Sequence, residues 1–293
     1  MDIRPSRGPD RAQRVTERAQ LEERVFSVKK RFLAMYKMAH AGHIGSSLSC
    51  AEILVFLKYA WMSDDDAFLL SKGHAVAALY SLLAEVGAIQ PRELDSFYGE
   101  GTHFPALPPV GAIDGIPFAT GSLGHGLSLS AGMALGARLD RRARRIFCLT
   151  SDGELDEGST WEAALFIAHR KLTNLVWLID RNRIQGIGRT EDVLGLEPLD
   201  AKLEAFGFHV VTADGHDFAA LVQARAECTR AVDAGERPVA IIANTVKGHG
   251  IRYMQDTVAS HYLPMDDSQY QQALDELAAA HAAALAGARD ETQ

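Results

Sequence analysis

The chain has 293 residues and a mass of 31.8 kDa, a length that suits one large domain or two small ones. Hydrophobic residues make up 47% of it and charged residues 23%, which excludes a disordered, collagen-like or low-complexity protein. The formal net charge of −8 argues against nucleic acid as the main partner. No apolar run approaches the roughly 20 residues of a membrane-spanning helix, so we expect no membrane association.

The cysteines and the N-terminal segment bear on cellular location. Cys50, Cys148 and Cys228 are widely spaced, so they do not form a disulfide framework and indicate a reducing compartment. Residues 1–20 mix arginines with acids and lack an apolar segment, which argues against a secretory signal and against a mitochondrial transit peptide. We therefore expect a cytoplasmic protein.

Helical spacing and short apolar runs predict the elements of the first half. The expected elements are a helix over 12–39, a Gly- and Ser-rich loop over 40–49, a helix over 50–61, a strand over 67–70, a helix over 73–86, a short helix from Pro91, and a long Pro-rich loop over 99–121. Loops as long as the last one are often functional.

Strands and helices alternate more regularly in the second half. Strands are predicted over 146–150, 175–179, 209–212 and 239–243, and helices over 157–169, 199–206 and 218–232. This alternation predicts an α/β fold with a parallel sheet and helices on both of its faces. The sequence shows no internal repeat and no clear linker, which favours one domain, and 275–293 is predicted to be a surface helix with a loose tail.

Polar residues follow two successive predicted strands. Asp152 and Gly153 follow the strand over 146–150, and Asn182 follows the strand over 175–179, a spacing of 182 − 152 = 30 residues. In a parallel sheet both positions lie at the carboxyl ends of strands, where α/β folds bind ligands. A carboxylate, an amide oxygen and the backbone carbonyl of Ile184 suit a hard divalent cation. The spacing therefore predicts a metal-bridged diphosphate site, although an acidic turn and an unrelated asparagine would give the same pattern.

Five motifs, in this order, resemble the transketolase family. They are AGHIGSSLS at 41–49, SKGHAVAALYSLL at 71–83, ATGSLGHGLSLSAGMALG at 119–136, SDGELDEG through Asn182, and VKGHG followed by His261. The resemblance implies the thiamine diphosphate-binding fold and spans about residues 20–275. The domains implied are an N-terminal extension at 1–20, a diphosphate-binding domain at 21–275 and a C-terminal helix and tail at 276–293.

The resemblance covers only the first domain of a complete transketolase. It therefore implies a subunit of a split transketolase, active in a hetero-oligomer with a second subunit that carries the pyrimidine-binding domain and the cofactor-activating glutamate. The reaction implied is transfer of a two-carbon ketol unit from a ketose to an aldose. Three positions depart from the usual family pattern: Ser151 replaces a glycine, His125 replaces a glutamine, and Phe104 separates His103 from Pro105.

Cofactor and metal roles follow from matching motif positions. The resemblance implies that Mg²⁺ or Ca²⁺ is held by Asp152, Asn182 and the Ile184 carbonyl. It implies that the other cofactor contacts are Gly121, Leu123, Ser151, Gly153, Glu157 and Glu162, together with Asp152 and Asn182. Glu157 and Glu162 are expected at the contact between the two cofactor-binding halves. They would equally suit the start of a helix, where the dipole favours acids.

Histidines are concentrated in the motif loops. His43, His74, His103 and His261 match family positions that face the cofactor ring and the sugar, so they are the candidate catalytic residues. Imidazole exchanges protons near neutral pH, which suits the movement of hydroxyl protons. His125 and His249 are secondary candidates.

Two other functions remain open at this level. One is the diphosphate-binding subunit of an enzyme with a 2-oxo acid donor, and the other is a cofactor-binding protein without catalysis. A 2-oxo acid donor needs fewer sugar-facing histidines, and loss of Asp152 or Asn182 would have favoured a non-catalytic protein.

Overall fold

The computed structural model describes residues 18–111, 113–235 and 237–290. The described chain divides into two compact units. Unit 1 comprises residues up to 64, 74–107 and the residues from 246 on, and unit 2 comprises 65–73 and 108–245. The predicted N-terminal extension, 1–20, lies almost wholly outside the described residues, and the predicted domain boundaries stay a prediction.

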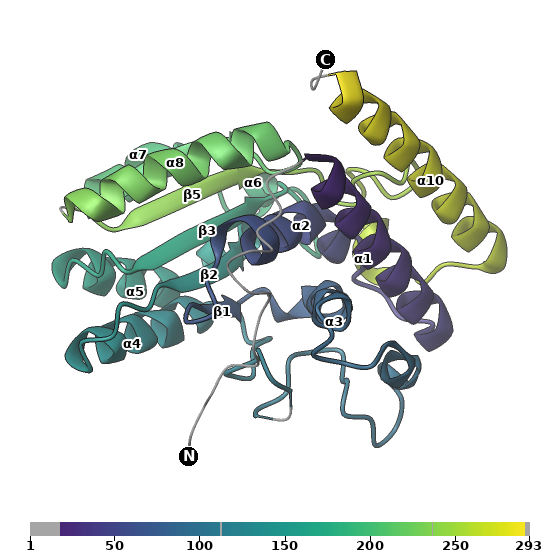
Figure 1. The fold of residues 1–293 in the computed structure, drawn as a ribbon, viewed down its shortest axis with the longest axis horizontal. Coiled ribbons are helices and arrows are strands. Elements are labelled where there is room, and N and C mark those ends of the chain that lie inside the picture. Colours follow the sequence, from purple (N-terminus) through teal and green to yellow (C-terminus); the bar gives the residue numbers. More distant parts are fainter. Residues whose placement is uncertain (1–17, 112, 236, 291–293) are drawn as a thin grey trace. The chain divides into compact units, whose positions relative to one another are not determined.

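Unit 2 is built on a five-stranded, fully parallel sheet in the order β1-β2-β3-β5-β4 (Figure 1). The strands are β1 (Ala67–Leu70), β2 (Ile146–Ser151), β3 (Leu175–Arg181), β4 (His209–Asp214) and β5 (Val239–Asn244). The helices are α4 (Gly126–Leu139), α5 (Gly158–His169), α6 (Thr190–Val193), α7 (Leu199–Phe206) and α8 (Phe218–Ala234). The predicted parallel α/β sheet is thus confirmed.

Alternate residues of the strands build the core on one face of this sheet. Leu175, Trp177 and Ile179 of β3 belong to the same buried cluster as residues of α4, α5 and α7, because every second side chain of a strand points to the same face. Helix α8 packs against β4 and β5. Helix α4 is absent from the expected elements, since its glycines and serines weaken the apolar pattern on which the prediction depends.

Unit 1 is helical. It contains α1 (Arg18–Ala39), α2 (Ile44–Phe56), α3 (Val76–Glu85), α9 (Ala259–Tyr262) and α10 (Asp267–Asp290), and α1 packs against α2, α3 and α10 (Figure 1). A π-helical turn, Leu57–Trp61, continues α2, and a 3₁₀ turn, Gly73–Ala75, precedes α3. Pro91–Ser96 is a 3₁₀ helix. The described part of 99–121 contains no helix or strand, as predicted.

The predicted loop over 40–49 is wrong, because α2 begins at Ile44. All residues of α2 are buried, and a Cβ added at Gly45 would lie 2.4 Å from the Ser260 hydroxyl oxygen. Small residues are therefore needed here for close packing rather than for a turn. Helix α10 also begins earlier than predicted, at Asp267.

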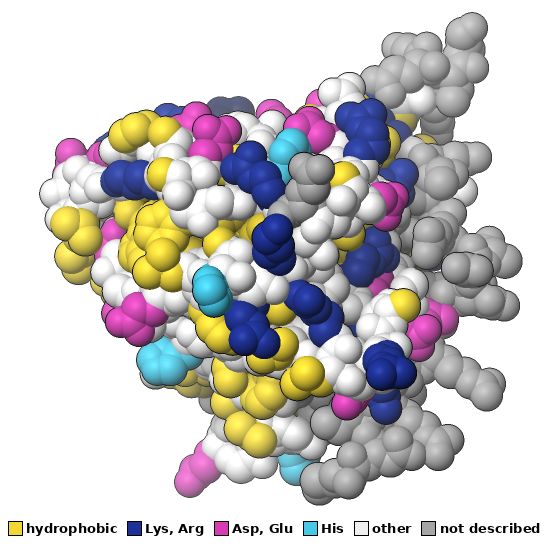
Figure 2. Space-filling model, turned by 90° about the vertical axis from the view of Figure 1, so that its left-hand side faces the viewer, with side chains coloured by type: hydrophobic (Ala, Val, Ile, Leu, Met, Phe, Trp, Pro, Cys, Tyr) yellow, Lys and Arg dark blue, Asp and Glu magenta, His cyan; other side chains and the backbone are white. Residues whose placement is uncertain are grey.

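Large apolar side chains remain exposed on two neighbouring helices of unit 2. Leu139 ends α4 and is 73% exposed, and Leu165 and Phe166 of α5 are 58% and 40% exposed. Figure 2 shows that hydrophobic side chains also form patches beside Lys and Arg side chains on one face of the molecule. Exposed apolar surface of this kind is typical of protein contacts. No helix among the described residues is long and apolar enough to cross a membrane.

Candidate active site

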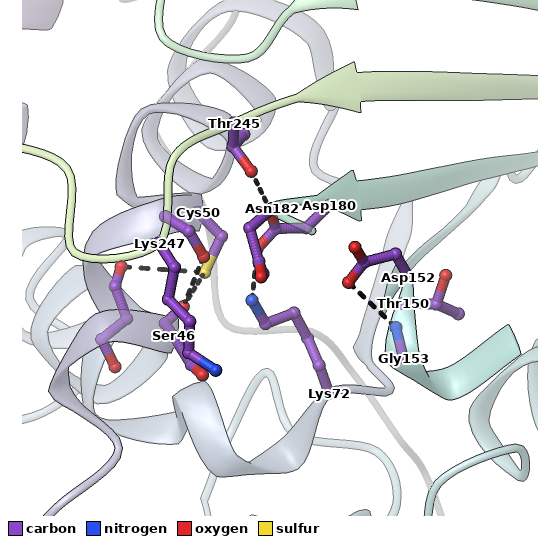
Figure 3. A network of polar contacts seen from close by, with 12 residues as sticks. Ser46, Cys50, Lys72, Thr150, Asp152, Gly153, Asp180, Asn182, Thr245 and Lys247 are labelled. Carbon is purple, nitrogen blue, oxygen red and sulfur yellow. Dashed lines mark hydrogen bonds and ion pairs between the residues drawn. The ribbon is translucent and has the colours of Figure 1, made fainter. Parts of the chain in front are cut away.

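Asp152 lies directly after β2, at the carboxyl edge of the sheet in unit 2 (Figure 3). Its side chain is almost fully buried and accepts hydrogen bonds from the Gly153 N–H at 2.9 Å, the Arg183 N–H at 2.6 Å and the Thr190 hydroxyl at 3.1 Å. Burial raises the pKa of Asp152 to about 6, and the negative charge of Asp180 adds to the rise. A bound cation would offset this cost of ionising the carboxyl group.

The other two predicted metal ligands lie after β3. Asn182 and Ile184 are both buried, and the amide oxygen of Asn182 accepts the Ile184 N–H at 3.2 Å. Arg183, between them in the chain, makes the 2.6 Å hydrogen bond to Asp152. The structure thus joins the ends of β2 and β3, and the carboxylate, amide and carbonyl oxygens found there fit Mg²⁺ or Ca²⁺.

A buried ion pair that the sequence did not predict lies at the same edge of the sheet. Lys72 and Asp180 are both 0% exposed and form a salt bridge. The hydroxyl group of Thr245 donates a hydrogen bond to Asp180 (Figure 3). The three residues come from the ends of β1, β3 and β5. Breaking such a pair leaves an uncompensated buried charge, so we infer that it fixes these strand ends relative to one another.

The glycine-rich loop at 120–126 is fixed against the ends of β1 and β2. Thr120 donates to the Leu70 carbonyl oxygen at 2.7 Å, and the buried Glu154 accepts the Gly124 N–H at 2.8 Å and the Ser71 hydroxyl. Two of the predicted cofactor contacts, Gly121 and Leu123, belong to this loop. Like Ser151, Asp152 and Gly153, they lie in unit 2. Glu154 was not a candidate, since its motif position gives no sign of burial.

Three predicted histidines meet in unit 1. The ring centroids of His43 and His261 lie 4.6 Å apart, and His74 lies 5.8 Å from each of them. His43 has a left-handed backbone conformation, with φ 70°, which is uncommon outside glycine. Burial lowers the pKa of His43, and the charge of Lys247 lowers it further. A neutral imidazole can both donate and accept a proton.

Backbones approach closely around this histidine cluster. The His43 N–H donates to the His261 carbonyl oxygen at 2.9 Å, and a Cβ at Gly42 would lie 2.6 Å from the carbonyl oxygen of Tyr262. The 261–262 segment therefore lies directly against the 42–43 segment, and Gly42 is needed for that approach. This close approach explains why the AGH motif has a glycine at position 42.

Other predicted site residues lie apart from these groups. His103 is exposed, and within the described residues it makes no ring contact with His43, His74 or His261. Glu157 and Glu162 are exposed at the start of α5. The secondary candidate His249 lies 3.4 Å from Glu52, which forms a 2.5 Å ion pair with Lys29.

A parallel sheet with buried polar oxygen atoms at its carboxyl edge is typical of α/β proteins that bind a ligand there. The family described as "Transketolase, thiamine diphosphate binding domain" matches residues 23–285. The chain belongs to this family. The match confirms the predicted family, its α/β fold and thiamine diphosphate as its cofactor.

Individual relatives agree with this assignment. The chain is 34% identical to one subunit of an apulose-4-phosphate transketolase from Actinobacillus succinogenes, over 88% of this chain and 96% of the relative. It is 38% identical to a 6-deoxy-6-sulfo-D-fructose transketolase subunit from a Clostridium species, over 80% and 88%. The crystal structure of Campylobacter jejuni transketolase superposes with a TM-score of 0.77 at 27% identity, covering 88% of this chain but only 42% of that one.

Proposed function

We propose that this chain is the diphosphate-binding subunit of a split, thiamine diphosphate-dependent transketolase, which transfers a two-carbon ketol unit from a ketose to an aldose. The observation that carries the proposal is the extent of the two subunit matches. The chain aligns with 96% and 88% of relatives that are named as transketolase subunits, but with only 42% of the Campylobacter jejuni transketolase chain.

The residues at the carboxyl edge of the sheet would hold the cofactor. Asp152, Asn182 and the Ile184 carbonyl would hold the divalent cation, and the backbone at Ser151 and Gly153 would lie close to the diphosphate. Gly121 and Leu123 of the fixed loop are the further contacts. When bound, thiamine diphosphate supplies the carbon nucleophile and the electron sink for breaking and forming carbon–carbon bonds.

The histidine cluster would serve the sugar. His43, His74 and His261 would bind hydroxyl groups of the ketose and take part in the transfer of their protons, and His103 is the fourth residue proposed for this role. Their rings lie within 6 Å of one another, so they can engage neighbouring hydroxyl groups on one short carbon chain. A 2-oxo acid donor carries no such row of hydroxyl groups, which makes the sugar reaction the better match.

A partner subunit with the pyrimidine-binding domain would complete the enzyme as a hetero-oligomer. Glu157 and Glu162 lie on the exposed side of α5, close in the chain to Leu165 and Phe166, so this surface suits a subunit contact. The three cysteines are free and buried, which is in keeping with the cytoplasmic location that we propose.

An assay of the purified subunit pair tests the function. The donor panel contains common ketose phosphates, apulose 4-phosphate, 6-deoxy-6-sulfo-D-fructose and pyruvate, with an aldose acceptor and Mg²⁺. We expect ketol transfer from at least one ketose. Turnover of pyruvate alone would favour the 2-oxo acid reaction, and cofactor binding without turnover of any donor would favour a non-catalytic protein.

We predict that His43→Ala and His74→Ala each lower kcat by about 100-fold or more, since general acid–base groups contribute roughly 10²–10⁴-fold. Cofactor affinity should change little, because these side chains act on the sugar. Steady-state kinetics and calorimetry on the subunit pair measure the two quantities. His209→Ala is the control, because His209 lies on the edge strand β4 and pairs with Glu227 at 3.1 Å. If both cluster variants keep a near-normal kcat, His43 and His74 have a structural role and not a catalytic one.

Cofactor binding should weaken in acid. A metal ligand must be deprotonated, and the pKa of Asp152 is raised to about 6. Protons therefore compete with the cation below about pH 6, and the apparent affinity for the Mg²⁺–cofactor complex should fall about tenfold per pH unit there. Calorimetry across this range measures the effect, corrected for Mg²⁺ binding to free cofactor. An affinity that stays constant through pH 6 would contradict the assignment of Asp152.

A further inference from the structure

Lys247 is a buried cation beside one of the clustered histidines. Its side chain is 1% exposed, and its Nζ lies 2.9 Å from Nδ1 of His261. Lysine is seldom buried so completely without a specific partner. The residue belongs to the VKGHG motif, but its place in that motif assigns it no role.

Tight packing fixes the position of Lys247 relative to His261. The Gly248 N–H donates to the Gly45 carbonyl oxygen at 3.1 Å, and a Cβ at Gly248 would lie 2.4 Å from the Met254 carbonyl oxygen. A Cβ at Gly45 would lie 3.0 Å from Cγ of Lys247 itself. The backbone next to Lys247 is therefore held, and Gly45 packs directly against the lysine side chain.

The chemistry of the two groups decides where the ring proton resides. An ammonium group carries three N–H donors and no acceptor, whereas neutral imidazole has one donor and one acceptor nitrogen. Nδ1 of His261 must therefore be the acceptor of this hydrogen bond. We propose that Lys247 sets the tautomer of His261, so that the ring is neutral with its proton on Nε2.

This assignment gives the three histidines different tasks, a consequence that rests on the proposed function. With the Nε2–H tautomer, His261 donates a hydrogen bond to a ketose oxygen and does not act as a proton acceptor there. Proton acceptance then falls to His43 or His74. The same positive charge also lowers the pKa of His43, so Lys247 acts on two rings of the cluster. Lys247 is thus a positioning residue for the sugar site.

Nuclear magnetic resonance of the full chain with ¹⁵N-labelled histidines tests the proposal without cofactor or sugar. Long-range ¹H–¹⁵N spectra report which ring nitrogen is protonated, and His261→Asn assigns the His261 signals. We expect an unprotonated Nδ1 and a protonated Nε2 in the wild-type chain. In Lys247→Met, which keeps the length of the stem and removes the donor, we expect a mixture of tautomers and a higher pKa for His43.

Lys202→Met is the matched control, because it removes the same positive charge from another place. Lys202 lies in unit 2 and donates a hydrogen bond to the Leu196 carbonyl oxygen. A protonated Nδ1 in the wild-type chain would overturn the proposal, and so would unchanged His261 signals in Lys247→Met. If Lys247→Met does not fold, as judged by circular dichroism, the wild-type spectrum still decides. None of these outcomes depends on turnover, so failure here is distinct from failure of the proposed transketolase activity.

Discussion

Replacing Asp152 by alanine is expected to abolish metal-dependent binding of thiamine diphosphate while the chain keeps its fold. The substitution removes the one charged oxygen donor among the proposed metal ligands. Loss of an outer-shell partner of a metal ligand costs about 10–100-fold in affinity, so loss of the ligand itself should cost at least about 100-fold. Calorimetry of the subunit pair with Mg²⁺ and cofactor measures the change. Asn182→Ala should act in the same direction.

Asp214→Ala is the matched control for this experiment. Asp214 also ends a parallel strand, β4, but its carboxylate accepts the His216 N–H at 2.8 Å and has no proposed metal role. Circular dichroism of the three variants verifies that the fold remains. Unchanged affinity in both Asp152→Ala and Asn182→Ala would show that the cation is bound elsewhere.

The isolated chain is expected to lack ketol transferase activity. Its partner is expected to carry the pyrimidine-binding domain and the glutamate that activates the cofactor. Groups that transfer protons in catalysis contribute about 10²–10⁴-fold, so turnover should fall by more than about 100-fold without the partner. Kinetic assays of this chain before and after addition of its partner measure the difference.

The exposed side of α4 and α5 allows a test of the proposed contact with a partner subunit. Phe166→Ser removes one of its large exposed side chains, so we expect weaker assembly of the pair in sedimentation experiments. Val222→Ser on α8 changes a side chain with a similar exposure, 39% against 40%, and serves as the control.

Full turnover by the isolated chain would contradict the expected dependence on a partner and would show that the active site of this chain is complete.

Local sequence patterns were sufficient for the strands and for the diphosphate motif. β1 coincides with its predicted range, and β2 and β5 extend only one residue beyond theirs, because each is a short apolar run of the kind that parallel sheets contain. Asp152 and Asn182 were found because parallel strands place their carboxyl ends at one edge. The family resemblance then supplied their expected chemistry and added the four histidines.

The histidine cluster shows where sequence information ended. The motifs named His43, His74 and His261, which are separated by up to 218 residues, but only the packed helices bring their rings within 6 Å. His103 was predicted from the same family resemblance, but in the structure it lies apart from these three histidines. Spacing along a chain does not determine which loops meet, because that depends on how the helices pack.

Tertiary structure alone decided the buried charges and the start of α2. Lys72, Asp180 and Glu154 read as ordinary polar residues in the sequence, yet each is 0% exposed and paired with a residue more than 80 positions away. The GSS segment resembles a loop, but it is helical and buried, and Gly45 leaves the space that the side chains of Lys247 and Ser260 occupy. The sequence determined the family, the sheet and the ligand types, since these depend on local pattern and motif. Ion pairs, tautomers and close backbone contacts depend on distances between remote segments, which only folding establishes.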